Sequence, residues 1–191
     1  MILRNLRING LGTGLNGILY NSGAQVSVEN CDIFGFIQNG ISANTSTVSD
    51  LYVTNTYITN SANGISLATT SPGLLAVIDR TKVYNVTTNG IAANSGIIDT
   101  EITNSAIGST TTALTVAGTS TRANLDTSTI FYNTTALSAT GNGSIIRISN
   151  NVIYDNSTNF TIGTGATIAT TGNNRVKPAG TTNPNGTVTQ Q

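Results

Sequence analysis

Short runs of alternating apolar and polar residues recur along the chain at a nearly constant spacing. The alternation is clearest in segments 26–33, 51–58 and 76–83, and each is followed by an Asn-Gly pair and a second alternating pair. In the first segment Val26 and Val28 share one face, while Ser27 and Glu29 share the other. This period of two predicts short β-strands with one buried face. The recurrence of the whole unit predicts an internal repeat.

One apolar position of the repeat can be followed along the whole chain. We place it at the following residues, with steps of 25, 25, 20, 27, 23 and 20: Val28, Val53, Ile78, Ile98, Leu125, Ile148 and Ile168. A period of this length is too short for the helical repeats and fits three short strands per turn of a solenoid. The sequence therefore predicts an all-β fold, a right-handed parallel β-helix of about seven or eight coils spanning residues 1–177. A polar tail, 178–191, is expected to pack on or near the last coil.

Asparagine is expected to shape the turns. Five asparagines follow the third strand at nearly the same place and predict a ladder of stacked amides, namely Asn60, Asn85, Asn104, Asn133 and Asn156. The Asn-Gly pairs at 16–17, 39–40, 63–64 and 89–90 are interpreted as sharp bends, because both residues accept a positive φ.

Composition limits the classes of function. Only 8% of the residues are charged, with eight basic and eight acidic side chains and no histidine. Without a basic cluster, neither nucleic acid nor an anionic membrane is an expected partner. The longest apolar stretches, such as 73–78, are too short to span a bilayer, and the first residues do not form a signal peptide. The repeat is already running within the first twenty residues, so the chain is expected to begin inside a coil.

The sequence resembles a known family, the bacterial right-handed parallel β-helix repeat proteins of the pectin-lyase-like superfamily. The stretches that carry the resemblance are 3–12, 28–31, 146–151 and 172–176, and together they extend over nearly the whole chain. The resemblance implies the fold and an extracellular or cell-surface location. It also raises the prospect of polysaccharide chemistry, which relatives perform with clustered carboxylates, with Ca²⁺ and a basic residue in the lyases or paired aspartates in the hydrolases.

This chain departs from both catalytic patterns, since it has no adjacent Asp-Asp pair and no histidine. The repeat register places Glu29, Asp79, Asp99 and Asp126 at one outward position, so the last three are expected about 5 Å apart in successive coils. Such a carboxylate column is a candidate for Ca²⁺ binding or for catalysis with Arg80 or Lys82 nearby. The alternative is a set of exposed acids that keep the rod soluble and discourage sideways sheet addition.

Three functional hypotheses remain. The first is a non-catalytic extracellular module that is structural, adhesive or an assembly unit, and that associates with itself head to tail through uncapped coil ends. The second is a polysaccharide-binding or polysaccharide-degrading β-helix, in which exposed rings such as Tyr84, Phe131, Tyr132 and Tyr154 contact sugars or cover turn edges. Ice binding is the third, and the variable outward residues disfavour it.

Overall fold

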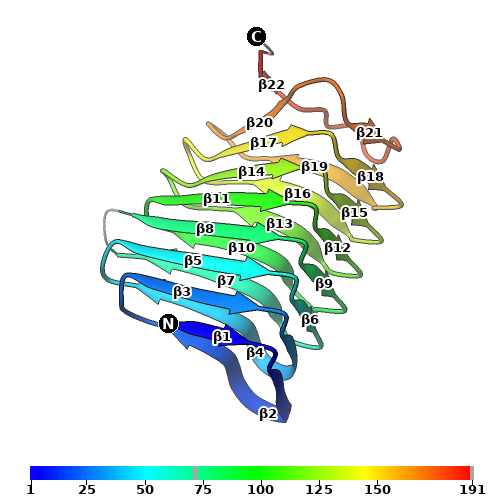
Figure 1. The fold of residues 1–191 in the computed structure, drawn as a ribbon. Helices are drawn as coiled ribbons and strands as arrows, with labels where there is room; N and C mark the ends of the chain where they lie inside the picture. Colours follow the sequence, from blue (N-terminus) through cyan, green and yellow to red (C-terminus); the bar gives the residue numbers. More distant parts are fainter. Residues whose placement is uncertain (71–72, 190–191) are drawn as a thin grey trace.

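The first strand of each coil belongs to a continuous parallel sheet, which we call the front sheet (Figure 1). This computed structural model describes residues 1–70 and 73–189. Within them the front sheet has nine strands, stacked in the order β1 (Ile2–Arg4), β3 (Gln25–Glu29), β5 (Ser49–Thr54), β8 (Leu74–Asp79), β11 (Ile98–Thr103), β14 (Arg122–Asp126), β17 (Ile145–Ser149), β20 (Thr167–Thr170) and β22 (Gly186–Thr187).

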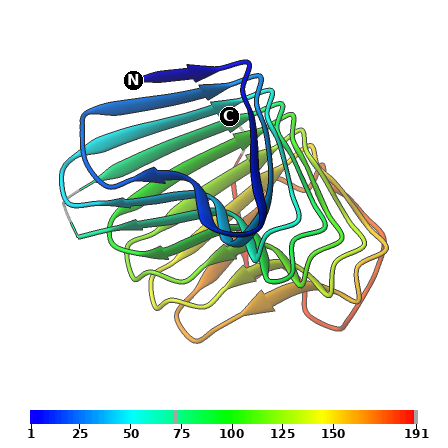
Figure 2. The same cartoon turned by 90° about the horizontal axis from the view of Figure 1, so that it is seen from below.

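The rest of each coil supplies a short second strand and a longer third strand (Figure 2). The second strands are β6 (Tyr57–Thr59), β9 (Lys82–Tyr84), β12 (Ala106–Gly108), β15 (Thr129–Phe131), β18 (Val152–Tyr154) and β21 (Arg175–Val176). The third strands are β7 (Asn63–Thr69), β10 (Asn89–Ser95), β13 (Thr112–Val116), β16 (Thr135–Ala139) and β19 (Thr158–Ile162). In the first coils β2 (Arg7–Tyr20) and β4 (Asp32–Thr45) bend through both positions without a break and join the two sets into one sheet.

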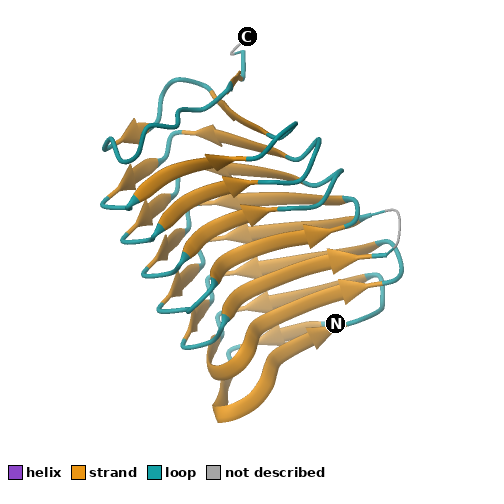
Figure 3. Cartoon of the chain, turned by 180° about the vertical axis from the view of Figure 1, so that it is seen from behind, coloured by secondary structure: helices purple, strands orange, loops and turns teal. Residues whose placement is uncertain are grey.

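Successive coils rise in a right-handed sense, so the predicted all-β parallel solenoid is confirmed, with about seven turns (Figures 1 and 3). Every strand pairing is parallel and joins one coil to the next, as between Val28 and Val53 or Ile65 and Ile91. Along residues 1–70 and 73–189 no helix is long and apolar enough to cross a membrane.

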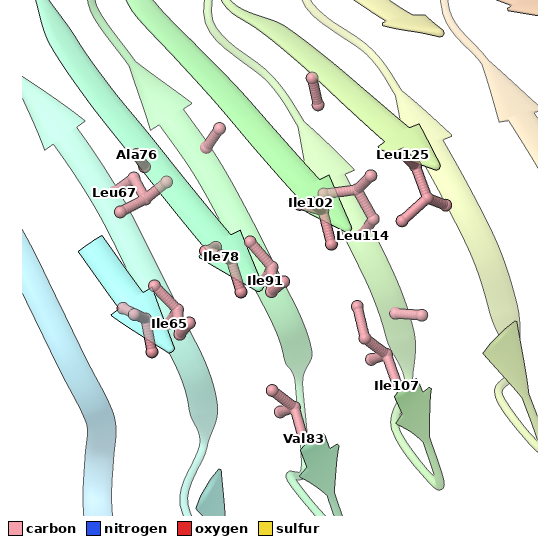
Figure 4. Close-up of a cluster of buried hydrophobic side chains, with 14 of the residues drawn as sticks. Ile65, Leu67, Ala76, Ile78, Val83, Ile91, Ile102, Ile107, Leu114 and Leu125 are labelled. Carbon is pink, nitrogen blue, oxygen red and sulfur yellow. The ribbon is translucent and has the colours of Figure 1, made fainter. Parts of the chain in front are cut away.

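The core is a set of aliphatic columns, where a column means the residues stacked at one position in successive coils. Ile78 from the front sheet, Val83 from a second strand and Ile91 from a third strand point into the interior of the same coil and are fully buried (Figure 4). The predicted alternating pairs of the third strands are confirmed, from Ile41 and Ala43 to Phe160 and Ile162. Each buried residue therefore packs on its own counterpart above and below, which keeps the core thin and continuous.

The predicted register of the front sheet is wrong at two coils. Ile102, and not Ile98, lies in the column of Ile78 and Leu125, and Thr170 replaces Ile168 at the end. The steps then become 25, 25, 24, 23, 23 and 22, which is more regular than the predicted series. The error arises because β11 has three inward positions and the middle one is a buried threonine, Thr100, which hides the alternation.

The Asn-Gly pairs do not have the predicted turn conformation. None of their four glycines has a positive φ. Glycine is required there by close approach, since a Cβ on Gly64 would lie 2.3 Å from Val83 Cγ1 and 2.5 Å from the carbonyl oxygen of Gly90. The asparagines form a hydrogen-bonded column instead, in which Asn63 Nδ2 donates to Asn39 Oδ1 at 3.0 Å. Beyond Gly90 the same position is taken by alanine, at Ala113 and Ala136.

The five predicted ladder asparagines do not share one column. Asn104 follows a front-sheet strand, while Asn60 and Asn85 follow second strands at a positive-φ position. Asn133 and Asn156 lie one residue further along, where they are buried and hydrogen-bonded, with Asn133 Nδ2 donating to Asn156 Oδ1 at 2.8 Å. Asn60 and Asn85 also lie in register, and their bond joins backbone groups, from Asn60 N to Asn85 O at 3.1 Å. In later coils Ser109, Tyr132 and Asp155 occupy the positive-φ position in place of asparagine.

A buried polar column lies beside the turn that follows each front-sheet strand. Its members are Cys31, Thr56, Thr81, Ser105, Ser128, Asn151 and Asn174. Five of these side chains accept a hydrogen bond from the backbone N–H of the preceding member, as Ser105 Oγ does from Thr81 at 3.1 Å; they are Thr56, Ser105, Ser128, Asn151 and Asn174. These bonds satisfy turn N–H groups that would otherwise be buried without a partner.

Candidate functional site

The carboxylates predicted to stack in three successive coils are interrupted in the structure. The column contains, in order, Glu29, Thr54, Asp79, Thr103, Asp126 and Ser149. Asp99 lies four residues before Thr103 and pairs in register with Leu75 and Arg122. Asp79 and Asp126 are therefore two coils apart, about 10 Å at the usual strand spacing. The predicted column of three adjacent carboxylates is wrong.

Asp79 takes part in bonds between coils. Its Oδ1 accepts hydrogen bonds from Thr103 Oγ1 and Asn104 Nδ2, both at 3.0 Å, and its Oδ2 lies 3.0 Å from Arg80 Nη2. Partial burial raises the pKa of Asp79, but the two hydrogen bonds and the positive charge of Arg80 outweigh it, so that the pKa is lowered. The group is ionised at neutral pH.

Asp126 is held in the same way two coils further on. Its carboxylate accepts hydrogen bonds from Ser149 Oγ, from Thr127 Oγ1 at 2.6 Å and from Asn150 Nδ2 at 3.0 Å. The bonds from Ser149 and Thr127 lower its pKa, and partial burial offsets this only in part. Both aspartates therefore use their oxygens for links within the solenoid.

Asp99 is exposed, with its Oδ1 3.6 Å from Arg122 Nη1. Within residues 1–70 and 73–189, no group of three or more acidic or cysteine side chains is placed to hold a metal ion. The Ca²⁺ site stays a prediction, and the spacing on which it was based is not present.

An open hollow lies on the outer side of the turns between β3 and β4, β5 and β6, and β8 and β9. We call it the turn groove. It encloses about 530 Å³ and is lined by Asn30, Cys31, Asp32, Asn55, Thr56, Tyr57, Arg80, Lys82 and Tyr84. The groove contains Arg80 and Lys82, the two basic residues that the sequence predicted beside the carboxylate column. Its own carboxylate is Asp32, and the three aspartates of the predicted column do not line it.

Two columns form the groove. One is the positive-φ turn position, with Asn30, Asn55 and Arg80 in successive coils, and Asn55 Nδ2 donates to Asn30 Oδ1 at 2.8 Å. The other is the first outward position of the second strands, where Asp32, Tyr57 and Lys82 are in register. Amide, aromatic and cationic groups are thereby brought together over three coils. They come from three equivalent triplets of the sequence, 30–32, 55–57 and 80–82.

Arg80 occupies a backbone position that suits it poorly. Its φ is +48°, and the equivalent residues 5, 30, 55, 104 and 150 are asparagine, while residue 127 is threonine. Asparagine tolerates the left-handed conformation, whereas longer side chains do so at a cost of roughly 1 kcal/mol. The Arg80 side chain is 63% exposed and, among the described residues, its ion pair is with the adjacent Asp79, so it remains accessible from the groove. Strain at an exposed cation is a feature of binding sites.

Aromatic rings extend from the groove along the second strands. Tyr57 and Tyr84 meet edge to face with centroids 5.9 Å apart, and Tyr84 meets Phe131 in the same way at 5.7 Å. Phe131 then stacks on Tyr154 at 5.6 Å with an interplanar angle of 9°. The ring of Phe131 reaches across Gly108, where a Cβ would lie 2.9 Å from its Cζ.

Burial raises the pKa of Tyr84, and the neighbouring Tyr57 and Tyr154 raise it further. The Tyr84 hydroxyl therefore keeps its proton at neutral pH and can donate a hydrogen bond.

Comparisons with protein-family models, with curated proteins and with solved structures give no match to this chain. The site therefore has to be interpreted from its own geometry. Sequence reasoning identified Arg80, Lys82 and Tyr84 but missed Tyr57 and the two asparagines. Aligning the three triplets, Asn-Cys-Asp, Asn-Thr-Tyr and Arg-Thr-Lys, would have found all of them, because each triplet begins directly after a front-sheet strand.

Proposed function

We propose that the chain is a non-catalytic adhesive module that binds an acidic saccharide in the turn groove. The observation that carries the proposal is the meeting of Tyr57, Arg80 and Lys82 in one hollow. A sugar carboxylate forms charge-assisted hydrogen bonds with Arg and Lys side chains. The apolar face of a sugar ring packs against an aromatic ring, and its hydroxyls bond with amides such as those of Asn30 and Asn55.

The aromatic rings of Tyr84, Phe131 and Tyr154, which we call the ring column, are arranged in a direction that favours an extended saccharide over a single sugar. Tyr84, Phe131 and Tyr154 lie on the outer face of β9, β15 and β18 and are partly exposed, with Gly108 of β12 between the first two, so they continue the groove parallel to the solenoid axis. Equivalent side chains of adjacent coils are about 5 Å apart, which places alternate coils at about the length of a disaccharide. A linear polysaccharide lying along this face is the ligand that the column fits.

The state of the carboxylates favours binding over catalysis. A glycosidase needs one protonated carboxyl and one free carboxylate about 5 to 9 Å apart. Asp79 and Asp126 have lowered pKa values and are engaged in bonds between coils, and Asp99 faces a cation. Membership of the pectin-lyase-like superfamily, a bacterial source and an extracellular or cell-surface location are part of this proposal. They rest on the resemblance of the sequence.

Calorimetric titration of the full chain with a galacturonic acid tetramer tests the proposal. We expect saturable binding by the wild type and none with a neutral glucose tetramer. Arg80→Asn restores the residue typical of the turn column and removes the cation, so we expect binding to weaken by about 10- to 100-fold, the worth of a charge-assisted hydrogen bond. Addition of EDTA should leave the affinity unchanged, since the groove binds its ligand without an ion.

Two further variants provide the controls. Tyr57→Ala should weaken binding by about 3- to 10-fold through loss of the ring contact. Arg122→Asn removes an exposed cation from the front sheet, outside the groove, and should bind as the wild type does. Equal binding of the acidic and neutral tetramers, or equal weakening by Arg80→Asn and Arg122→Asn, would reject the groove as the site.

A further inference from the structure

The second strands carry two cations at the same outward position of distant coils. Lys82 lies in β9 and Arg175 in β21, and the register joins them through Ala106, Thr129 and Val152. Figure 1 shows these strands stacked along one edge of the solenoid. We call this set the Lys82–Arg175 column. At the usual strand spacing its two cations, four coils apart, are separated by about 19 Å.

Both cations are available to a ligand. Lys82 and Arg175 are exposed, and neither forms an ion pair with any residue that the structure describes. Lys177, two residues beyond Arg175, differs in this respect because its ammonium pairs with the carboxylate of Asp155. The unpaired cation of the last coil on this face is therefore Arg175.

The chain that follows β21 leaves this face open. Asn159 N, in a third strand, donates to Ala179 O at 3.2 Å, and β22 then pairs with β20 in the front sheet. These residues pack on the last coil away from the second strands. A ligand can therefore reach the guanidinium of Arg175 without displacing any of them.

The surface between the two cations suits the uncharged parts of a saccharide. The column there consists of Ala106, Thr129 and Val152, which are short, partly exposed and without charge. The ring column lies two residues further along the same strands, on the same face, because side chains at positions i and i+2 of a strand point the same way. Sugar rings lying over the short side chains can pack against this row of aromatic rings.

We propose that Arg175 forms a second subsite for an acidic sugar, so that the protein selects oligosaccharides of five or more units with acidic groups about four units apart. The inference rests on the proposed function and adds to it the length of the ligand and the place of its second charge. Alternate coils match about a disaccharide, so the four coils from Lys82 to Arg175 match about four units. One acidic group then binds Arg80 and Lys82, and the other binds Arg175.

The second contact should have a modest but measurable effect on affinity. A saccharide already held in the turn groove reaches Arg175 as part of the same molecule, so the contact gains from a high effective concentration. Arg175 is exposed, and an exposed ion pair changes an equilibrium by about 5-fold at most. We therefore expect about a 5-fold difference between ligands that reach Arg175 and ligands that do not.

Calorimetric titration of the full chain with a galacturonic acid trimer and a hexamer tests the second subsite. The hexamer can span the column and the trimer cannot. Arg175→Thr introduces the residue that Thr129 supplies in the same column, and should weaken hexamer binding by about 5-fold while leaving trimer binding unchanged. A hexamer also has more ways to occupy the groove than a trimer, but that gain is common to both proteins and cancels when the hexamer-to-trimer ratios are compared.

Arg122→Asn is the matched control, because it removes an exposed cation from the front sheet and should leave the ratio of hexamer to trimer affinity unchanged. Circular dichroism verifies that each variant is folded. As a second measurement, the backbone amide signals of Val152 and Arg175 should shift when the hexamer binds and stay in place when the trimer binds.

The outcomes separate this inference from the proposed function. If both ligands bind and depend on Arg80, but Arg175→Thr leaves the ratio unchanged, the second subsite is rejected and the groove proposal stands. Equal weakening of trimer and hexamer by Arg175→Thr would also reject the subsite, because the effect would not depend on ligand length. If neither ligand binds the wild type, both proposals are wrong.

Discussion

The two halves of the solenoid build equivalent turns from different residues. In the first four coils an Asn-Gly pair begins the third-strand segment, and the front-sheet turn carries asparagine or Arg80 beside an open groove. In later coils threonine and alanine replace Asn-Gly, and the front-sheet turn is filled by hydrogen bonds around Asp126. The turn after the front-sheet strand therefore presents side chains to an open groove in one half and is closed by hydrogen bonds within the solenoid in the other.

The difference shows that the repeat fixes where a side chain lies but not what it does. Asp79 and Asp126 have the chemistry of a site, yet their partners lie in the next coil and use that chemistry internally. Arg80, in contrast, has an unfavourable backbone conformation, and its exposed side chain is accessible from outside the solenoid. Function is therefore best sought where the repeat departs from its own typical residue.

The largest expected effect concerns the glycines of the first half. Gly64→Ala would place its Cβ 2.3 Å from Val83 Cγ1, and the tightly stacked coils leave little room to relax. We expect a loss of about 3 kcal/mol in the free energy of unfolding, measured by urea denaturation. The matched change in the second half, Ala136→Gly, removes only a methyl group and should cost about 1 kcal/mol. Equal losses would show that the two halves pack alike at this position.

A medium effect is expected for acid stability. Because the pKa values of Asp79 and Asp126 are lowered on folding from about 3.8, their stabilisation is present above that pH and is lost as the pH falls through the folded pKa values. Asp126→Asn should cost about 1 kcal/mol at pH 7 and reduce the dependence of stability on pH below 4. Denaturation at a series of pH values gives the measurement. An unchanged pH dependence would contradict the role given to this carboxylate.

The smallest effect is a gain in stability. Thr127 is a β-branched residue at a φ of +48°, in the column where asparagine is usual. Thr127→Asn relieves backbone strain but loses the hydroxyl bond to Asp126, so we expect a net gain of about 0.5 kcal/mol. Arg80→Asn should likewise not lower the thermal midpoint, even though it weakens binding. A substantial loss of stability in both variants would mean that neither position is strained.

The fold could be predicted from the sequence because aliphatic side chains alternate strictly in most coils. The third strands, with pairs such as Ile65 and Leu67, were placed correctly for this reason. The predicted register of the front sheet was wrong at β11 because Thr100 is polar and yet buried. The pattern of hydrophobic residues gives no signal for such a position. The conformation of the Asn-Gly pairs was predicted wrongly because a close backbone contact and a positive φ both select glycine.

The groove was harder to predict than the fold. Its residues are separated by a full coil and differ in type, so that no local motif joins Asp32, Tyr57 and Lys82. They can be recognised as neighbours only when the strand register is known to within one residue. The error at Ile98 shows how a displacement of four residues brings together the wrong carboxylates.

Chemical-shift mapping tests the central claim most directly, because it compares the two halves in one experiment. Isotope-labelled chain is titrated with the galacturonic acid tetramer and the backbone amide signals are followed. We expect the changes to be concentrated at residues 30–32, 55–57 and 80–84, with smaller ones along the ring column and none around Asp126 and Ser149. Changes centred on Asp126, or no changes at saturating saccharide, would contradict the assignment of binding to the turn groove.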